Sequence, residues 1–155
     1  MMRVFLFIAV LFILPLTQAC AKNDDFIRDT LTLKTAAGQE IPFDIELAVT
    51  PGQQATGMMH RTEMADNFGM LFLFNDEAMR SFWMKNTLLP LDIIFADKYG
   101  KIKHIHHDAK PLDETHIPSL YPAYAVFEIK GGMSEKLGIK EGDIINHAFF
   151  ETSPE

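Results

Sequence analysis

The chain has 155 residues, a formal net charge of −7, and hydrophobic residues at 48% of its positions. This length and apolar fraction support one domain with a packed core and exclude a disordered chain. The acidic balance also argues against a nucleic-acid partner, because such a partner requires clustered lysine and arginine.

The first 21 residues have the layout of a secretory signal peptide. A short basic start at residues 1–3 precedes an apolar run at residues 4–16. The run is shorter than the roughly 20 apolar residues that span a bilayer, so we expect no integral membrane span after processing. The small residues predict cleavage after Ala21, with cleavage after Ala19 as the alternative. We therefore expect an exported protein, periplasmic or extracellular.

Cys20 offers a third form of processing, in which lipidation anchors the chain to a membrane. Thr17 stands where a lipoprotein signal usually has leucine, and Gln18 is large for its position. These two residues disfavour the lipid anchor without excluding it. After cleavage at Ala21 no cysteine remains, so the domain is expected to fold without disulfides.

Residues 22–29 are predicted to be a linker, residues 30–150 a single β-rich domain, and residues 151–155 a tail. Alternation of apolar and polar residues at 30–34 and 41–49 predicts two strands joined as a hairpin. The further strands predicted along the chain are 69–74, 82–84, 91–96, 101–107, 124–129 and 144–150.

Two short helices are predicted between these strands. Thr50 is a suitable N-cap with Pro51 at the first helical position, which predicts a helix over residues 51–59. A second helix over residues 133–137 is expected to stop at Gly138. Many short strands with two short helices predict a mainly β fold, either a β-sandwich or a partly closed barrel.

The segment around the only tryptophan is the first candidate site. In a functional interpretation, Asn86 and Thr87 present amide and hydroxyl groups to a ligand, Lys85 binds an anionic group, and Trp83 supplies a stacking face. In the structural alternative this segment is a tight corner, whose Asn and Thr side chains bond nearby backbone while Asp92 caps or pairs locally.

Arg61 is the second candidate, because its guanidinium has five donors that fit a carboxylate. Asp92 and Glu128 are the candidate partners, since each is an acid inside an otherwise apolar strand. The alternative is that Arg61 holds an anion or a substrate carboxylate. The predicted ligand-binding residues are therefore Arg61, Trp83, Lys85, Asn86, Thr87, Asp92 and Glu128.

Histidines crowd one predicted strand. His104 and His106 lie two residues apart and so share a face, as a metal site on a strand would require, and Glu114 or His116 could add ligands. Solvated histidines near a strand end are the alternative, and no metal or other cofactor is expected. For catalysis, the sequence has no Gly-x-Ser-x-Gly motif and the processed chain has no cysteine nucleophile.

Several blocks of sequence occur together in order: Gly-Met-Met-x-Arg at 57–61, Gly-Met-Leu-Phe-x-Phe at 69–74, Phe-Trp-Met-Lys-Asn-Thr at 82–87 and Pro-Leu-Asp-Ile-x-Phe at 90–95. With the late Glu128, they resemble the family called domain of unknown function 192. The resemblance covers nearly all of residues 30–150. It implies a single compact β-sandwich of jelly-roll type, often exported in bacteria, and it implies no reaction.

From these observations we expect a non-enzymatic binding domain for a small anionic or hydroxylated, saccharide-like envelope ligand. One alternative is a metal-dependent enzyme that uses His104 and His106. Another is a protein-interaction module of a cell-envelope complex. The sequence does not identify the ligand or the envelope partner.

Overall fold

The computed structural model describes residues 26–152, and the predicted signal peptide lies outside them. Within this range no helix is both long and apolar enough to cross a membrane. The elements follow in the order β1 (Ile27–Lys34), β2 (Glu40–Ala48), α1 (Pro51–Thr56), β3 (Phe68–Ala78), β4 (Ser81–Phe82), β5 (Leu91–Ala96), β6 (Ile102–Ala109), β7 (Ile117–Pro118), β8 (Ala123–Lys130), α2 (Met133–Leu137) and β9 (Ile144–Asn146).

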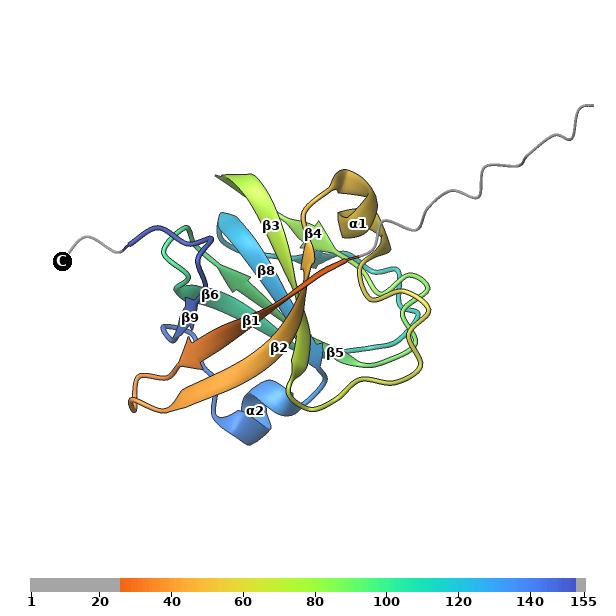
Figure 1. Ribbon diagram of the computed structural model, residues 1–155. Helices are drawn as coiled ribbons and strands as arrows, with labels where there is room; N and C mark the ends of the chain where they lie inside the picture. Colours follow the sequence, from red (N-terminus) through yellow and green to blue (C-terminus); the bar gives the residue numbers. More distant parts are fainter. Residues whose placement is uncertain (1–25, 153–155) are drawn as a thin grey trace, which may run out of the picture.

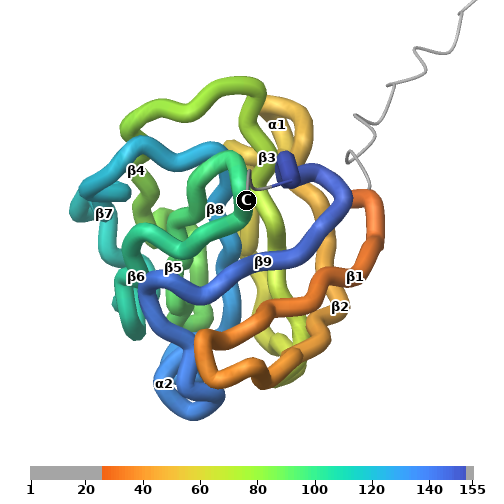
Figure 2. The backbone as a smooth tube through the Cα atoms, turned by 90° about the vertical axis from the view of Figure 1, so that its left-hand side faces the viewer, coloured from red at the N-terminus to blue at the C-terminus, as the bar shows by residue number. Residues whose placement is uncertain are grey.

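Seven strands form one curled sheet in the order β6-β5-β8-β3-β2-β1-β9, and β4 pairs with β7 in a small second sheet. A bridge between Lys101 and Ile144 joins the two ends of the large sheet. The sheet therefore closes part-way into a barrel, with α1 and α2 at opposite ends (Figures 1 and 2). This confirms the predicted mainly β fold with two short helices, in its partly closed form.

The predicted hairpin is present, because β1 and β2 pair antiparallel along their length, with Leu33 opposite Ile41. The pairing of β2 with β3 is parallel, with Ile45 opposite Gly69, and α1 lies in the connection between them. Thr50 caps α1 as predicted, and its side chain accepts a hydrogen bond from the backbone N–H of Gln53. Local sequence signals therefore define the hairpin and the helix start.

The structure differs from the prediction at several boundaries. β1 begins at Ile27, inside the segment expected to be a linker, because residues 27–29 pair with β2 although their side chains are exposed. α1 ends at Thr56, where Gly57 adopts a φ of 45° and breaks the helix. β9 stops at Asn146, and β7 is a two-residue strand that has no alternation to reveal it.

The central strands β3, β5 and β8 are buried on both faces. One hydrophobic cluster lies inside the curl, and its largest fully buried members include Leu33, Phe43, Ile45, Leu71 and Phe127. A second cluster covers the outer face of the same strands, and its largest members include Met70, Phe72, Met84, Ile93 and Phe95. The division between the two clusters follows from the alternation of side chains along each strand. The candidate site lies on the outer face.

Candidate functional site

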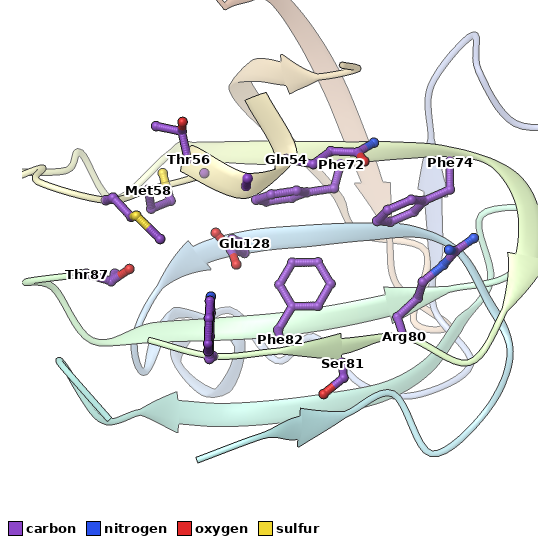
Figure 3. A pocket seen from close by; sticks show the side chains of 14 residues that line it. Gln54, Thr56, Met58, Phe72, Phe74, Arg80, Ser81, Phe82, Thr87 and Glu128 are labelled. Carbon is purple, nitrogen blue, oxygen red and sulfur yellow. The ribbon is translucent and has the colours of Figure 1, made fainter. Parts of the chain in front are cut away.

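A cavity of about 310 Å³ opens between the outer face of the large sheet, α1 and β4. This volume is at the lower end of the range for small-molecule sites. Figure 3 shows the side chains that line the cavity. They are Gln54, Ala55, Thr56, Gly57, Met58, Met59, Phe72, Phe74, Arg80, Ser81, Phe82, Trp83, Thr87 and Glu128.

Aromatic rings form much of the wall. Phe72 on β3 and Phe82 on β4 meet edge to face, with ring centroids 5.2 Å apart. Trp83 follows β4, lines the cavity and remains 42% exposed, and one face of its indole stacks on His116 at 6.4 Å. An exposed tryptophan beside an open cavity offers a stacking surface to a bound ring.

The polar residues Lys85, Asn86 and Thr87 form a structural corner at one end of the cavity. Asn86 has a left-handed φ of 53°, and its carbonyl accepts a hydrogen bond from the N–H of His60 at 2.9 Å. The carbonyl of Thr87 accepts from the N–H of Leu112 at 3.1 Å. The hydroxyl of Thr87 donates to the carbonyl of Lys85 at 3.3 Å, and Thr87 also lines the cavity. At Thr87 the structural corner is therefore also a cavity wall.

Glu128 is the polar group that distinguishes this cavity. It is 4% exposed, and its neighbours across the sheet are Met70 on β3 and Ile93 on β5. Its carboxyl makes no hydrogen bond or ion pair with any residue between 26 and 152. No fully buried side-chain oxygen in that range lacks a partner, so the Glu128 oxygens open to the cavity (Figure 3).

Burial raises the pKa of the Glu128 carboxyl from an ordinary 4.5 to about 8. The physical cause is desolvation, because an ionised carboxylate is unfavourable among apolar side chains when no cation lies beside it. At neutral pH the group is therefore mostly protonated. A protonated carboxyl can donate one hydrogen bond and accept others.

Arg61 lies outside the cavity lining and pairs with Glu46 on β2, not with Asp92 or Glu128. The prediction of an Arg–acid pair is confirmed, but the predicted partners are wrong. The parallel pairing of β2 with β3 brings Glu46 to this position. The guanidinium also lies 5.5 Å from the ring centroid of Phe68, so its surroundings are those of a packed structural pair.

Asp92 is fully buried on β5 and accepts four hydrogen bonds. The donors are the backbone N–H groups of Asp108, Gly132 and Ser134 and the hydroxyl of Ser134, at 2.7–3.0 Å. None of these groups lines the cavity. Asp92 therefore joins β6 and the start of α2 to the sheet. Lys85 is also absent from the cavity lining, and its ammonium lies 5.1 Å from the centroid of the Trp83 ring.

Two of the histidines of β6 contact different partners. His104 stacks on Phe95 and lies 3.2 Å from Glu141, whereas His107 lies 2.9 Å from the hydroxyl of Ser134. Burial, and then the neighbouring histidines, lower the pKa of His106. Among residues 26–152 no three His, Cys, Asp or Glu side chains are grouped as metal ligands.

This partly closed β domain has relatives among known proteins. The family model of the domain of unknown function 192, DUF192, described as "Uncharacterized ACR", matches residues 32–147. The chain belongs to this family. No protein of curated function matches this DUF192 chain significantly.

Two solved structures resemble this DUF192 domain. A protein from Sinorhizobium meliloti 1021, described as "a putative transcription regulator", is 38% identical with a TM-score of 0.79, and the match covers 81% of this chain and 97% of that one. A protein of unknown function from Novosphingobium aromaticivorans DSM 12444 is 43% identical with a TM-score of 0.74, covering 77% and 85%. Both structures support the fold.

Of the predicted ligand-binding residues, Trp83, Thr87 and Glu128 line the cavity of this DUF192 domain. Lys85 and Asn86 lie between two of these residues in the sequence but are not part of the lining. Five aromatic or sulfur-containing lining residues were missed by sequence reasoning, although all five lie in the sequence blocks that resemble the family. The missed residues of this kind are Met58, Met59, Phe72, Phe74 and Phe82. Gln54 and Arg80 were also missed, and no sequence signal marks them.

Proposed function

We propose that this DUF192 domain is an exported binding domain for a small, hydroxylated, ring-shaped ligand, such as a saccharide fragment of the cell envelope. The observation that carries the proposal is the Glu128 carboxyl, which is buried, unpaired within the described chain, and open to an aromatic-walled cavity. An unpaired carboxyl in an apolar setting lowers stability, so a ligand-binding role explains its presence better than a structural role.

The polar groups of the cavity match hydroxyl groups. The protonated Glu128 carboxyl can both donate and accept hydrogen bonds, as a sugar hydroxyl can. The Thr87 hydroxyl uses its proton on the Lys85 carbonyl and keeps its acceptor capacity. The exposed indole of Trp83 supplies an apolar face for the C–H groups of a sugar ring. Orientation and stacking are thus provided by different residues.

Binding is favoured over hydrolysis. Glu128 is the one carboxyl among the described residues that line the cavity. Glycoside hydrolysis normally uses two carboxyl groups at a defined separation, one as acid and the other as base or nucleophile. We therefore propose recognition of the ligand without its cleavage.

The transcriptional role named for the S. meliloti protein is not favoured for this chain. A protein that binds DNA neutralises phosphates with clustered lysine and arginine. The present chain has 21 acidic residues against 14 basic ones. The proposal therefore excludes a nucleic-acid partner.

The proposal is tested by replacing Trp83 with alanine. The chain is screened against mono- and disaccharides by calorimetry, and we expect the best of them to bind the variant about tenfold more weakly, because a stacking tryptophan is commonly a dominant binding contact. Tyr121→Ala is the matched control, since Tyr121 is 50% exposed and lies outside the cavity lining. Failure of every saccharide to bind the unmodified chain would refute the proposal.

A specific observation also favours a protein-interaction module as a second candidate function. Leu88 and Leu112 are 45% and 59% exposed, in segments that hydrogen-bond to each other beside Trp83. Leu112 has a φ of 62°, which a bulky residue rarely adopts. A strained and exposed leucine does not contribute to the core, so its presence favours a role in binding another protein.

Leu112→Asn is therefore expected to raise the free energy of unfolding, by about 0.5–1 kcal/mol, because asparagine tolerates a left-handed φ better than leucine does. Urea denaturation measures this change. Leu88→Asn is the control and should bring no such gain, as Leu88 has no positive φ. A clear loss of stability in Leu112→Asn would mean that the leucine packs onto the domain, and the reason for an interaction role would disappear.

A further inference from the structure

Arg80 lies at the other side of the cavity from Glu128. In Figure 3 the ring of Phe82 lies between the two side chains. Arg80 occupies the short connection between β3 and β4, and its backbone N–H donates to the hydroxyl of Ser119 at 3.0 Å. Arg80 and Glu128 are the two ionisable residues among the described lining of the cavity.

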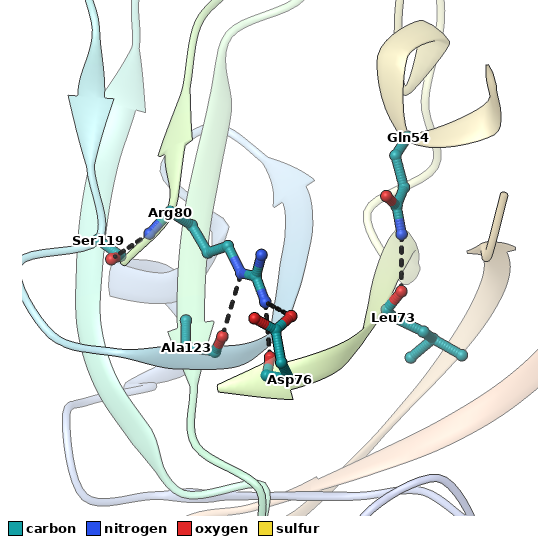
Figure 4. Close-up of polar contacts among 6 residues, drawn as sticks. All are labelled: Gln54, Leu73, Asp76, Arg80, Ser119 and Ala123. Atoms are coloured by element: carbon teal, nitrogen blue, oxygen red, sulfur yellow. Dashed lines mark hydrogen bonds and ion pairs between the residues drawn. The ribbon is translucent and has the colours of Figure 1, made fainter. Parts of the chain in front are cut away.

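The guanidinium of Arg80 is held in one orientation by several contacts (Figure 4). Nε donates to the carbonyl of Ala123 at 3.3 Å, and Nη2 donates to the carbonyl and the carboxylate of Asp76 at 2.6 and 2.7 Å. The Cζ atom lies 4.0 Å from the ring centroid of Phe74. Nη1 has no hydrogen-bond partner in the described range, so its two N–H groups are free to bind a ligand.

The charge of the cavity follows from these two residues. Glu128 is mostly uncharged at neutral pH, because burial raises its pKa. Arg80 keeps its positive charge under all physiological conditions. Asp76 offsets this charge only in part, because its side chain is 69% exposed and therefore screened by water. The cavity thus favours a negative charge near Arg80, although the chain as a whole is acidic.

We propose that the ligand carries a single carboxylate on its hydroxylated ring, that Nη1 of Arg80 binds this carboxylate, and that Glu128 and Thr87 bind ring hydroxyls beyond Phe82. The ligand class is then that of the acidic sugars. This assignment rests on the function proposed above and adds the charge of the ligand to it. A doubly charged phosphate fits less well, because Arg80 is the one cation among the described lining residues and already has a carboxylate beside it.

Because the guanidinium is already fixed, little side-chain entropy is lost when it binds an anion. A charge-assisted hydrogen bond is also stronger than a neutral one. We therefore expect glucuronate and galacturonate to bind the purified chain about tenfold more tightly than glucose and galactose do, as measured by calorimetry at neutral pH.

Two variants test whether Arg80 is responsible. Arg80→Gln should reduce the uronate preference to less than about threefold, since the cation is lost. Asp76→Asn keeps an acceptor for Nη2 but removes a nearby negative charge, so it should strengthen uronate binding and leave the neutral sugars unchanged. Asp76 is on the surface, so this second variant gives a result even if Arg80→Gln does not fold.

The outcomes separate this inference from the proposed function. Equal affinity of the unmodified chain for uronates and their neutral parents would overturn the role of Arg80 and leave saccharide binding in place. A uronate preference that Asp76→Asn does not increase would also overturn it. If no sugar of either kind binds, the proposed function itself fails, and the assignment of Arg80 fails with it.

Discussion

Asp92→Ala is expected to be among the most destabilising single substitutions in this domain. The variant leaves four donors, three backbone N–H groups and the hydroxyl of Ser134, without the fully buried carboxylate that accepts from them. An unsatisfied buried polar group costs roughly 1–3 kcal/mol, and loss of one member of a buried network costs more. We therefore expect the free energy of unfolding to fall by about 3–5 kcal/mol, as measured by urea denaturation.

Two controls show whether burial of the network is the cause. Asp92→Asn keeps one acceptor oxygen and should lose less stability than Asp92→Ala. Asp66 also holds two partners, Lys130 and Lys136, but on the surface. Asp66→Ala should therefore change stability little, because water replaces exposed ion pairs. If Asp66→Ala and Asp92→Ala lose the same stability, the structural role assigned to Asp92 is wrong.

Glu128→Gln is expected to change the pH dependence of stability. The folded state holds the Glu128 proton more tightly than the unfolded state, since burial raises the pKa of this carboxyl from 4.5 to about 8. The stabilising effect of this proton is complete below about pH 4.5 and is lost as the pH rises towards 8, by at most about 1.4 kcal/mol per pH unit. Glutamine carries no titrating proton, so the variant avoids this loss.

The difference in free energy of unfolding between Glu128→Gln and the unmodified chain should therefore grow with pH. We expect the variant to be more stable by roughly 1–3 kcal/mol at pH 7, with a smaller difference at pH 4.5. Denaturant titrations at several pH values measure the effect. Glu77→Gln controls for the loss of one acidic side chain at an exposed position on β3. A difference that stays constant from pH 4.5 to pH 9 would show that Glu128 is not held in its neutral form.

This expected gain in stability bears on function. A residue whose replacement stabilises a protein is typically retained for activity or binding. Glutamine keeps donor and acceptor groups of similar shape, so Glu128→Gln should retain part of the saccharide affinity. Because the ionised carboxylate loses its donor, binding by the unmodified chain should weaken above about pH 8, and the variant should not share this loss.

Much of the fold follows from local sequence. Alternation along residues 41–49 places apolar side chains on one face of a strand whatever its neighbours are. The cap at Thr50 and Pro51 starts a helix for reasons contained within one turn. β7 could not be predicted, since two residues show no period. The parallel pairing of β2 with β3 joins segments that are not adjacent in a hairpin, so local signals do not reveal it.

The candidate site shows the same division. Asp92 and Glu128 were predicted as site residues for the same reason, since each is an acid within an apolar strand. Trp83 and Thr87 were predicted because both lie in the segment around the tryptophan. Only the tertiary structure decided which of them share a cavity. In the pairing of β5 with β8, Ile93 stands opposite Glu128, whereas Asp92 stands opposite Ile129.

Asp92 and Glu128 are thus offset by one residue within a single register, and this offset places the two acids on opposite faces of the sheet, because side chains alternate along each strand. On one face Asp92 meets the donors of α2 and β6 and is fully paired. On the other face Glu128 meets apolar neighbours and an open cavity. The sequence by itself therefore determined the fold class and the residues worth testing, and the strand register decided which acid supports the structure and which is available to a ligand.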